Sequence, residues 1–73
     1  MLTEKELTLR IKIVRNYLGM TQDDFGRQLG LTEYAVAQIE KGNRPLTINM
    51  INILESCGIN RNYFFDQKAR VKY

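Results

Sequence analysis

The chain has 73 residues and one cysteine, Cys57, so it is long enough for one small domain and cannot form an internal disulfide. Its net charge of +3 permits a polyanionic partner without requiring one. The sequence contains no histidine, which removes most metal-binding and nucleophilic chemistry. We therefore expect no enzymatic activity, no cofactor and no metal.

The sequence indicates neither a membrane segment nor an export signal. No apolar stretch approaches the roughly 20 residues that a membrane helix needs. The stretch from Ile11 to Leu18 is interrupted by charged side chains, and the first residues have no apolar run. A single cysteine is also typical of a reducing compartment. We expect a cytoplasmic protein with no membrane contact and no small-molecule ligand.

Five capping residues predict where helices begin. Each is preceded by an apolar residue and followed by another four positions later, which is typical of a capped helix with a hydrophobic contact across its first turn. The caps are Thr3, Thr21, Thr32, Thr47 and Asn60. Glycines at positions 19, 30, 42 and 58 are placed to end the first four helices. Because no alternating apolar pattern competes, the sequence predicts an all-α fold of five helices.

The first predicted helix spans about residues 4–18 and carries two apolar rows. The row with the spacing of a buried face consists of Leu7, Ile11, Val14 and Leu18. A second row, formed by Leu9, Ile13 and Tyr17, lies on another side of the same helix. This second row either contacts neighbouring helices and the C-terminal segment, or forms a surface for a partner protein.

The stretch from Thr21 to Gly42 predicts two short helices joined by a tight turn. Gly30 ends the first of them, because a left-handed terminal residue is free of strain only for glycine. Thr32 then caps a second helix over residues 33–41. The apolar positions of the two helices are Phe25, Leu29, Val36 and Ile39. Two helices with so short a connection cross steeply, as a helix-turn-helix unit.

This stretch resembles the Cro and lambda-repressor-like family of DNA-binding domains, also called the xenobiotic-response-element type. The residues that carry the resemblance are Thr21, Gln22, Phe25, Leu29, Gly30, Leu31, Thr32, Val36, Ile39, Glu40 and Gly42. The resemblance covers about residues 7–65. It implies a compact five-helix DNA-binding domain, which we assign to residues 1–66, with the helix-turn-helix at the second and third helices. A basic tail over residues 67–73 would follow.

The resemblance also concerns three single residues. It implies a structural ion pair between Arg15 in the first helix and Glu40 in the third. Gly26 stands where the family usually has alanine, and a glycine inside a helix costs about 1 kcal/mol relative to alanine. This glycine either lets the third helix approach closely or is a tolerated weakness.

The C-terminal third supplies a helix, an aromatic segment and the tail. A helix over about residues 48–57 offers apolar residues to the core, with Cys57 as a small buried member. Residues 59–65 are predicted to form a fifth, single-turn helix, in which Tyr63 and Phe65 either pack on the core or contact a partner. The cations of the tail are Lys68, Arg70 and Lys72. Because the tail has little to pack against, we expect it to be mobile.

The resemblance implies that the third helix enters the major groove of double-stranded DNA. The side chains left on its outer face as candidate base contacts are Glu33, Tyr34, Ala37 and Gln38. Gln38 can bind adenine in bidentate fashion, and Glu33 can accept a hydrogen bond from cytosine. The candidate phosphate contacts are Gln22, Arg27, Lys41, Asn43 and Arg44. For the loop residues Asn43 and Arg44 the alternative is solvation without DNA contact, and the basic tail is a further candidate.

Two functions are compatible with these residues. The first is a sequence-specific transcription regulator, acting as a homodimer, which resembles the phage or mobile-element switch proteins of a bacterial or phage-infected cell. The second is a protein-interaction module with the same fold, which binds another phage-type regulator and modulates it. The second stays open because the predicted cationic footprint is small. Its partner surface would consist of Leu9, Ile13, Tyr17, Tyr63 and Phe65.

Overall fold

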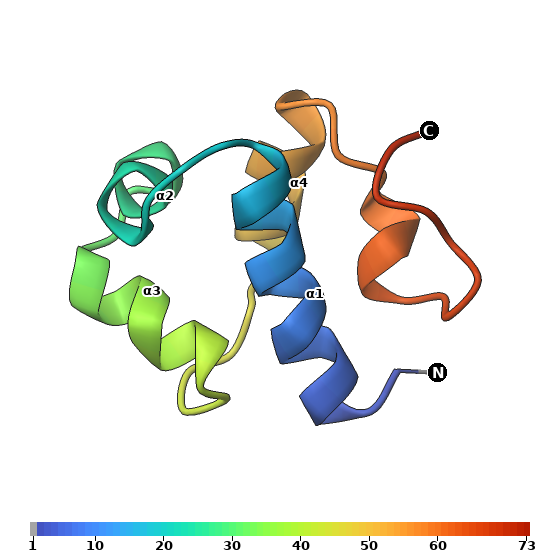
Figure 1. Cartoon of the computed structure of the whole chain (residues 1–73), viewed down its shortest axis with the longest axis horizontal. Helices are drawn as coiled ribbons and strands as arrows, with labels where there is room; N and C mark the ends of the chain where they lie inside the picture. The colour runs from blue at the N-terminus through green and yellow to red at the C-terminus, as the bar shows by residue number, and fades with distance from the viewer. Residues whose placement is uncertain (1) are drawn as a thin grey trace.

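The structure, a computed structural model, describes residues 2–73. Within that range the chain forms four α-helices and one 3-10 turn, and no strand. They are α1 (Glu4–Tyr17), α2 (Gln22–Leu29), α3 (Glu33–Glu40), α4 (Ile48–Ser56) and η1 (Arg61–Phe64). Helix α1 runs through the middle of the molecule, with α2 and α3 on one side and η1 with the C-terminal segment on the other (Figure 1). The all-α prediction is confirmed.

The prediction of five helices is wrong: the described chain has four α-helices, and the segment predicted as a fifth, single-turn helix forms the 3-10 turn η1. The guanidinium of Arg10 on α1 donates hydrogen bonds to the backbone carbonyls of Tyr63, Asp66 and Gln67, at 2.8, 2.8 and 2.7 Å. The segment therefore stays tied to α1 and turns back after one turn.

All helix starts follow the predicted caps. Thr3 and Thr21 each complete a capping box, the first with Glu6 and the second with Asp24. Thr32 and Thr47 accept a hydrogen bond from the third residue of α3 and of α4, and Asn60 caps η1. Local sequence is sufficient for these contacts, because every cap bonds within its own first turn.

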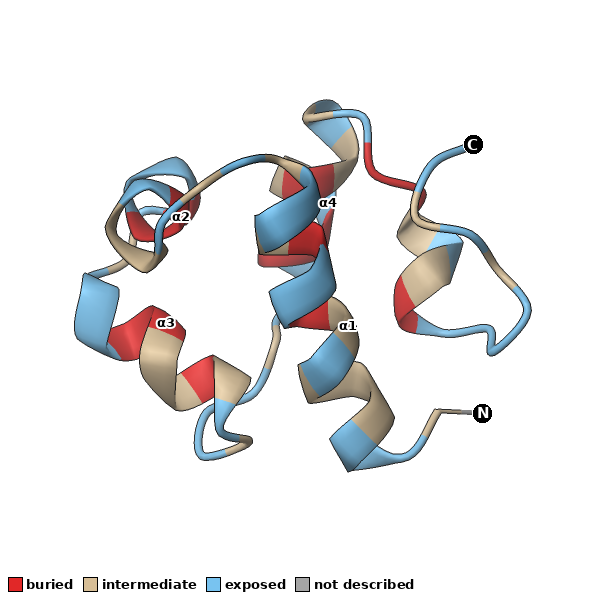
Figure 2. Ribbon diagram, viewed as in Figure 1, coloured by how far each residue is buried: buried red, intermediate tan, exposed pale blue. Residues whose placement is uncertain are grey.

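The core lies where α1 meets the other helices, and Figure 2 shows the buried segments facing this interior. Its buried members are Ile11, Val14, Phe25, Leu29, Val36, Ile39, Met50, Ile51, Leu54, Ile59 and Phe64. Leu7 and Leu18, predicted for the same face of α1, are partly buried at its edge. Cys57 is half-buried and is a free thiol, so the prediction that it is a buried member of the core is corrected.

Gly26 is where α2 meets the start of α3. A Cβ atom at this position would lie 2.7 Å from the carbonyl oxygen of Leu31 and 3.1 Å from that of Thr32. Both obstacles are backbone atoms, which cannot rotate aside. Of the two interpretations of this glycine, the structure therefore favours the close approach of α3.

We expect Gly26→Ala to destabilise the protein. The helix-propensity gain is about 1 kcal/mol, whereas forcing a methyl group into a packed site costs about 1–3 kcal/mol. The expected net loss is up to about 2 kcal/mol of unfolding free energy, measured by urea denaturation. Gln28→Ala, an exposed site on the same helix, should stay within about 0.5 kcal/mol. A stabilised Gly26→Ala variant would show that α2 and α3 separate at no cost.

The C-terminal segment is attached to the domain, which corrects the expectation that the tail has little to pack against. Val71 packs on the core. The backbone N–H and side-chain amide of Asn60 donate to the carbonyls of Val71 and Arg70, at 2.9 and 3.1 Å. The hydroxyl of Tyr73 donates to the carboxylate of Glu55. This hydrogen bond lowers the pKa of Glu55, assisted by Arg61, and raises the pKa of Tyr73.

Candidate nucleic-acid interface

The turn between α2 and α3 fixes how α3 is presented. Gly30 adopts the left-handed conformation, with φ of 72°, and the N–H of Leu31 then donates to the carbonyl of Gly26 at 2.7 Å. Phe25 of α2 and Val36 of α3 are both buried in the core. One face of α3 is thus held against the domain, and its opposite face is left to solvent.

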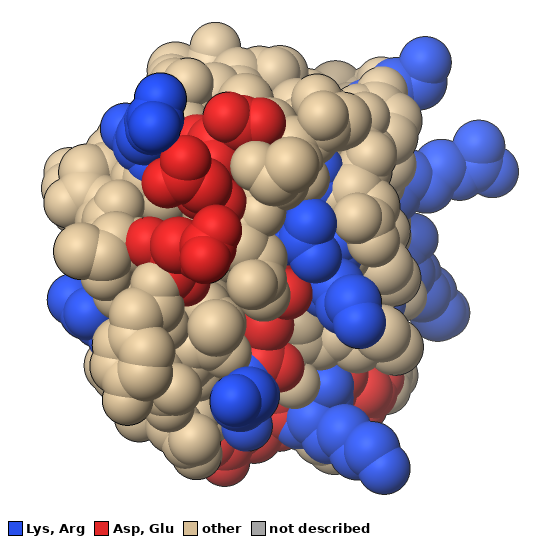
Figure 3. Space-filling view, turned by 60° about the vertical axis from the view of Figure 1, so that its left-hand side comes forward, with Lys and Arg blue, Asp and Glu red and all other residues tan. Residues whose placement is uncertain are grey.

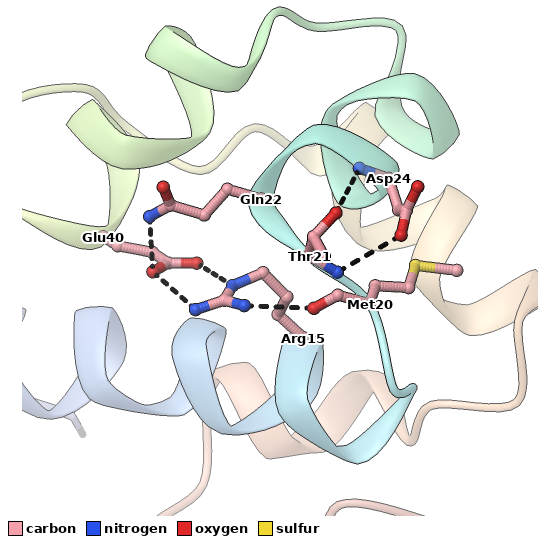
Figure 4. A network of polar contacts seen from close by, with 6 residues as sticks. All are labelled: Arg15, Met20, Thr21, Gln22, Asp24 and Glu40. Carbon is pink, nitrogen blue, oxygen red and sulfur yellow. Dashed lines mark hydrogen bonds and ion pairs between the residues drawn. The ribbon is translucent and has the colours of Figure 1, made fainter.

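A polar network holds the far end of α3 (Figure 4). Nε of Arg15 lies 2.7 Å from Oε2 of Glu40, in an ion pair whose side chains are only 13% and 7% exposed. The side-chain amide of Gln22 donates to Oε1 of Glu40 at 3.2 Å, and Nη1 of Arg15 donates to the carbonyl of Met20 at 3.0 Å. The network therefore connects α1, the start of α2 and the end of α3 at one carboxylate.

The outer face of α3 carries the predicted base contacts at different depths. Glu33 is exposed and Tyr34 is 74% exposed, whereas Ala37 and Gln38 are half-buried. Oε1 of Gln38 accepts a hydrogen bond from Nδ2 of Asn43 at 3.0 Å. The side chains of Glu33, Tyr34 and Gln38 thus lie along a surface that a DNA groove could meet.

The predicted phosphate contacts differ in whether their side chains are already bonded within the domain. Lys41 and Arg44 are exposed and form no ion pair with any residue from 2 to 73. Arg27 is also exposed, but pairs with Asp23 one turn earlier at 3.1 Å. The amide of Gln22 is engaged with Glu40. Two free cations thus lie at the end of α3 and in the loop that follows it.

A family model of helix-turn-helix domains, of the Cro/C1 type, matches residues 11–64. The chain belongs to this helix-turn-helix family. Comparison with curated proteins and with solved structures finds no match. The matched range contains the helix-turn-helix formed by α2 and α3, the fourth helix and η1. The protein is thus a DNA-binding helix-turn-helix domain.

The charge of this helix-turn-helix is unusual for a surface that meets DNA. Residues 21–44 carry four acidic and three basic side chains, although the whole chain has a net charge of +3. Figure 3 turns this side of the molecule forward and shows acidic side chains grouped on it, with most Lys and Arg toward one edge. The C-terminal segment with Lys68 and Arg70 lies across the molecule from α2 and α3 (Figure 1). The tail is therefore poorly placed to assist α3.

The residues of the predicted partner surface differ in exposure. Leu9, Ile13 and Tyr17 are 58%, 39% and 50% exposed, and Phe65 is 51% exposed. Tyr63 is instead half-buried, with the guanidinium of Arg10 4.5 Å from the centre of its ring. Four of the five residues are accessible to a partner, and Tyr63 belongs to the attachment of η1.

Sequence reasoning missed Arg10 as an organising residue of this helix-turn-helix domain. Its hydrogen-bond acceptors are backbone carbonyls more than 50 positions away. No residue type signals such a contact, because every residue has a carbonyl. The role of Arg10 depends on the tertiary fold alone.

The described residues offer little for a ligand or metal. A pocket of about 210 Å³ lies between α1 and the loop before α4, below the roughly 300–1,000 Å³ typical of small-molecule sites. A second hollow of about 340 Å³, between the start of α1 and Lys41–Gly42, is a more open depression of the surface. Among residues 2–73 no group of His, Cys, Asp or Glu could hold a metal ion. No helix in this range is long and apolar enough to cross a membrane.

Proposed function

We propose that the protein is a sequence-specific transcription regulator of the Cro/repressor type, which binds double-stranded DNA as a homodimer. Helix α3, with Lys41 at its end, would lie in the major groove, which admits one α-helix. The observation that carries the proposal is the outer face of α3, where Glu33, Tyr34 and Gln38 lie on a rigidly held helix. Lys41 and Arg44 would contact the phosphates beside them.

The proposal is tested by selecting binding sites from a random-sequence DNA pool with the purified protein. Enrichment of a two-fold symmetric site would support a dimeric regulator, because half-site symmetry follows the symmetry of the protein. Weak binding with no enriched sequence at any salt concentration would contradict the proposal.

Gln38→Ala is expected to weaken binding to the selected site by about 1–3 kcal/mol, because one base contact is lost. The half-buried position of Gln38 on the outer face of α3 should leave the fold intact. Binding is measured by fluorescence anisotropy, with thermal unfolding as the check on folding. Gln28→Ala, exposed on α2, is the control. Unchanged affinity of Gln38→Ala would remove Gln38 from the interface.

A second function is favoured by the exposed row Leu9, Ile13 and Tyr17 together with the near-neutral helix-turn-helix. In this alternative the domain is a protein-interaction module that binds another regulator and modulates it. An apolar row on one helix face is typical of protein contact, and few free cations are typical of weak DNA binding. The two functions differ in which face of the domain is used.

Ile13→Asp separates the two functions. For the DNA-binding function we expect less than about a twofold change in affinity for the selected site, because Ile13 is an exposed residue of α1 and belongs to neither helix of the helix-turn-helix. Asn16→Asp adds the same charge at an exposed neighbouring position and is the control. If Ile13→Asp abolished regulation in cells while Asn16→Asp did not, and both variants stayed folded, the protein-interaction function would replace the first.

A further inference from the structure

Among the four helix ends of the described chain, the one that follows α3 differs in carrying a polar, exposed residue, Asn43, after its glycine. After each α-helix a glycine with positive φ turns the chain, and the next residue donates its N–H back to the helix, as in a Schellman motif. In the motifs that follow α1, α2 and α4 this next residue is apolar and packs on the core: Met20, Leu31 and Ile59. After α3 it is Asn43, which is exposed.

The backbone of this motif places Asn43 beside Gln38. The N–H of Asn43 donates to the carbonyl of Gln38 at 2.9 Å, and the N–H of Gly42 donates to the carbonyl of Ile39 at 3.0 Å. An apolar contact commonly joins the same two positions of a Schellman motif. Here an amide–amide hydrogen bond takes its place, from Nδ2 of Asn43 to Oε1 of Gln38 at 3.0 Å.

This hydrogen bond leaves the two ends of the Gln38 amide unequal. Oε1 already accepts one hydrogen bond, from Asn43, and keeps one lone pair free, whereas both N–H groups of Nε2 are without a partner among residues 2–73. A bidentate contact with adenine uses the glutamine oxygen for N6–H and the nitrogen for N7. An amide that offers chiefly its N–H groups suits guanine better, because guanine presents two acceptors, O6 and N7, in the major groove.

We propose that Asn43 is a positioning residue that sets the base preference of Gln38, favouring guanine over adenine at the position that Gln38 reads. This inference rests on the DNA-reading function proposed above and refines it. It differs from the interpretation drawn from the residue type alone, in which Gln38 can bind adenine in bidentate fashion.

The test uses the full chain and duplexes of the selected site that differ only at the position read by Gln38. That position is the one at which Gln38→Ala removes base discrimination. For the unsubstituted protein we expect guanine to be bound about fivefold or more tightly than adenine. Asn43→Ala should bring the guanine-to-adenine ratio toward one.

Asn43→Asp is the decisive variant. A carboxylate can only accept hydrogen bonds, so it would engage Nε2 of Gln38 and leave Oε1 for the base. The preference should then move from guanine to a base that presents an N–H donor, adenine or cytosine. The added negative charge lowers affinity for all duplexes alike, so the ratio between duplexes is the readout. Asn16→Asp carries the same charge on α1 and should keep the original ratio.

Each other outcome overturns the inference in a recognisable way. If Asn43→Ala and Asn43→Asp weaken binding to all duplexes equally, Asn43 acts only as part of the helix end. If the unsubstituted protein prefers adenine, or if Gln38→Ala removes no base discrimination while selective binding persists, the inference fails and the DNA-binding function stands. If no sequence is selected at all, the proposed function fails and this inference fails with it.

Discussion

Arg15→Met is expected to lower the unfolding free energy by about 3–5 kcal/mol, because it leaves a nearly buried carboxylate without its cation. The side chain of Glu40 is only 7% exposed. After the substitution, its one remaining side-chain donor in the structure would be the amide of Gln22, at 3.2 Å. Small domains have about 5–15 kcal/mol of stability in total, so this single change should leave the protein close to unfolding at physiological temperature.

Urea denaturation followed by circular dichroism measures this effect. Arg27→Ala, which breaks the exposed ion pair with Asp23, is the matched control and should cost less than about 1 kcal/mol. In the double variant Arg15→Met/Glu40→Leu, much of the loss should be recovered, because an apolar pair no longer strands a charge. A cost of Arg15→Met as small as that of Arg27→Ala would show that water reaches Glu40.

The affinity for DNA should fall steeply with salt, and the steepness should report the number of protomers bound. Each protomer offers three candidate cations, Arg27, Lys41 and Arg44. A slope of about −0.9 per phosphate contact in log affinity against log salt gives about −3 for a monomer and about −5 for a dimer. Between 50 and 200 mM salt the affinity should thus fall about 40-fold for a monomer and about 2,000-fold for a dimer.

Two substitutions test whether these cations form the footprint. Arg44→Ala should reduce the slope by about one unit for each protomer bound, and should weaken binding equally on all sequences. Arg70→Ala, in the C-terminal segment across the molecule from α3, should leave the slope unchanged (Figure 1). The reverse result would place the DNA on the C-terminal side of the domain.

The helix boundaries are the part of the fold that the sequence by itself determined. Thr3, Thr21, Thr32 and Thr47 each bond to the first turn of the helix that they begin. The glycines that follow the helices supply the positive φ that closes them. These signals are local, because cap and partner lie three residues apart, so no knowledge of the tertiary fold is needed.

The sequence also indicated which residues lie on the outer face of α3, because a helix with Val36 and Ile39 buried has only one other side. It did not reveal what those residues bond to. The hydrogen bond between Asn43 and Gln38 depends on the fold of the chain after Gly42. In the base preference proposed for Gln38, the choice between guanine and adenine would therefore follow from geometry and not from residue type.

Tertiary structure alone decided three further features. The close approach at Gly26 arises because α3 starts 2.7 Å from where a side chain would begin. The attachment of η1 to α1 and the attachment of the C-terminal segment arise because Arg10 and Asn60 bond to carbonyls that fold back from elsewhere in the chain. Residue types do not show which backbone carbonyls accept such bonds or where two backbone segments come close, because every residue has the same backbone. The sequence thus determined where each helix begins and ends, and long-range packing determined how the helices meet and where the C-terminal segment is held.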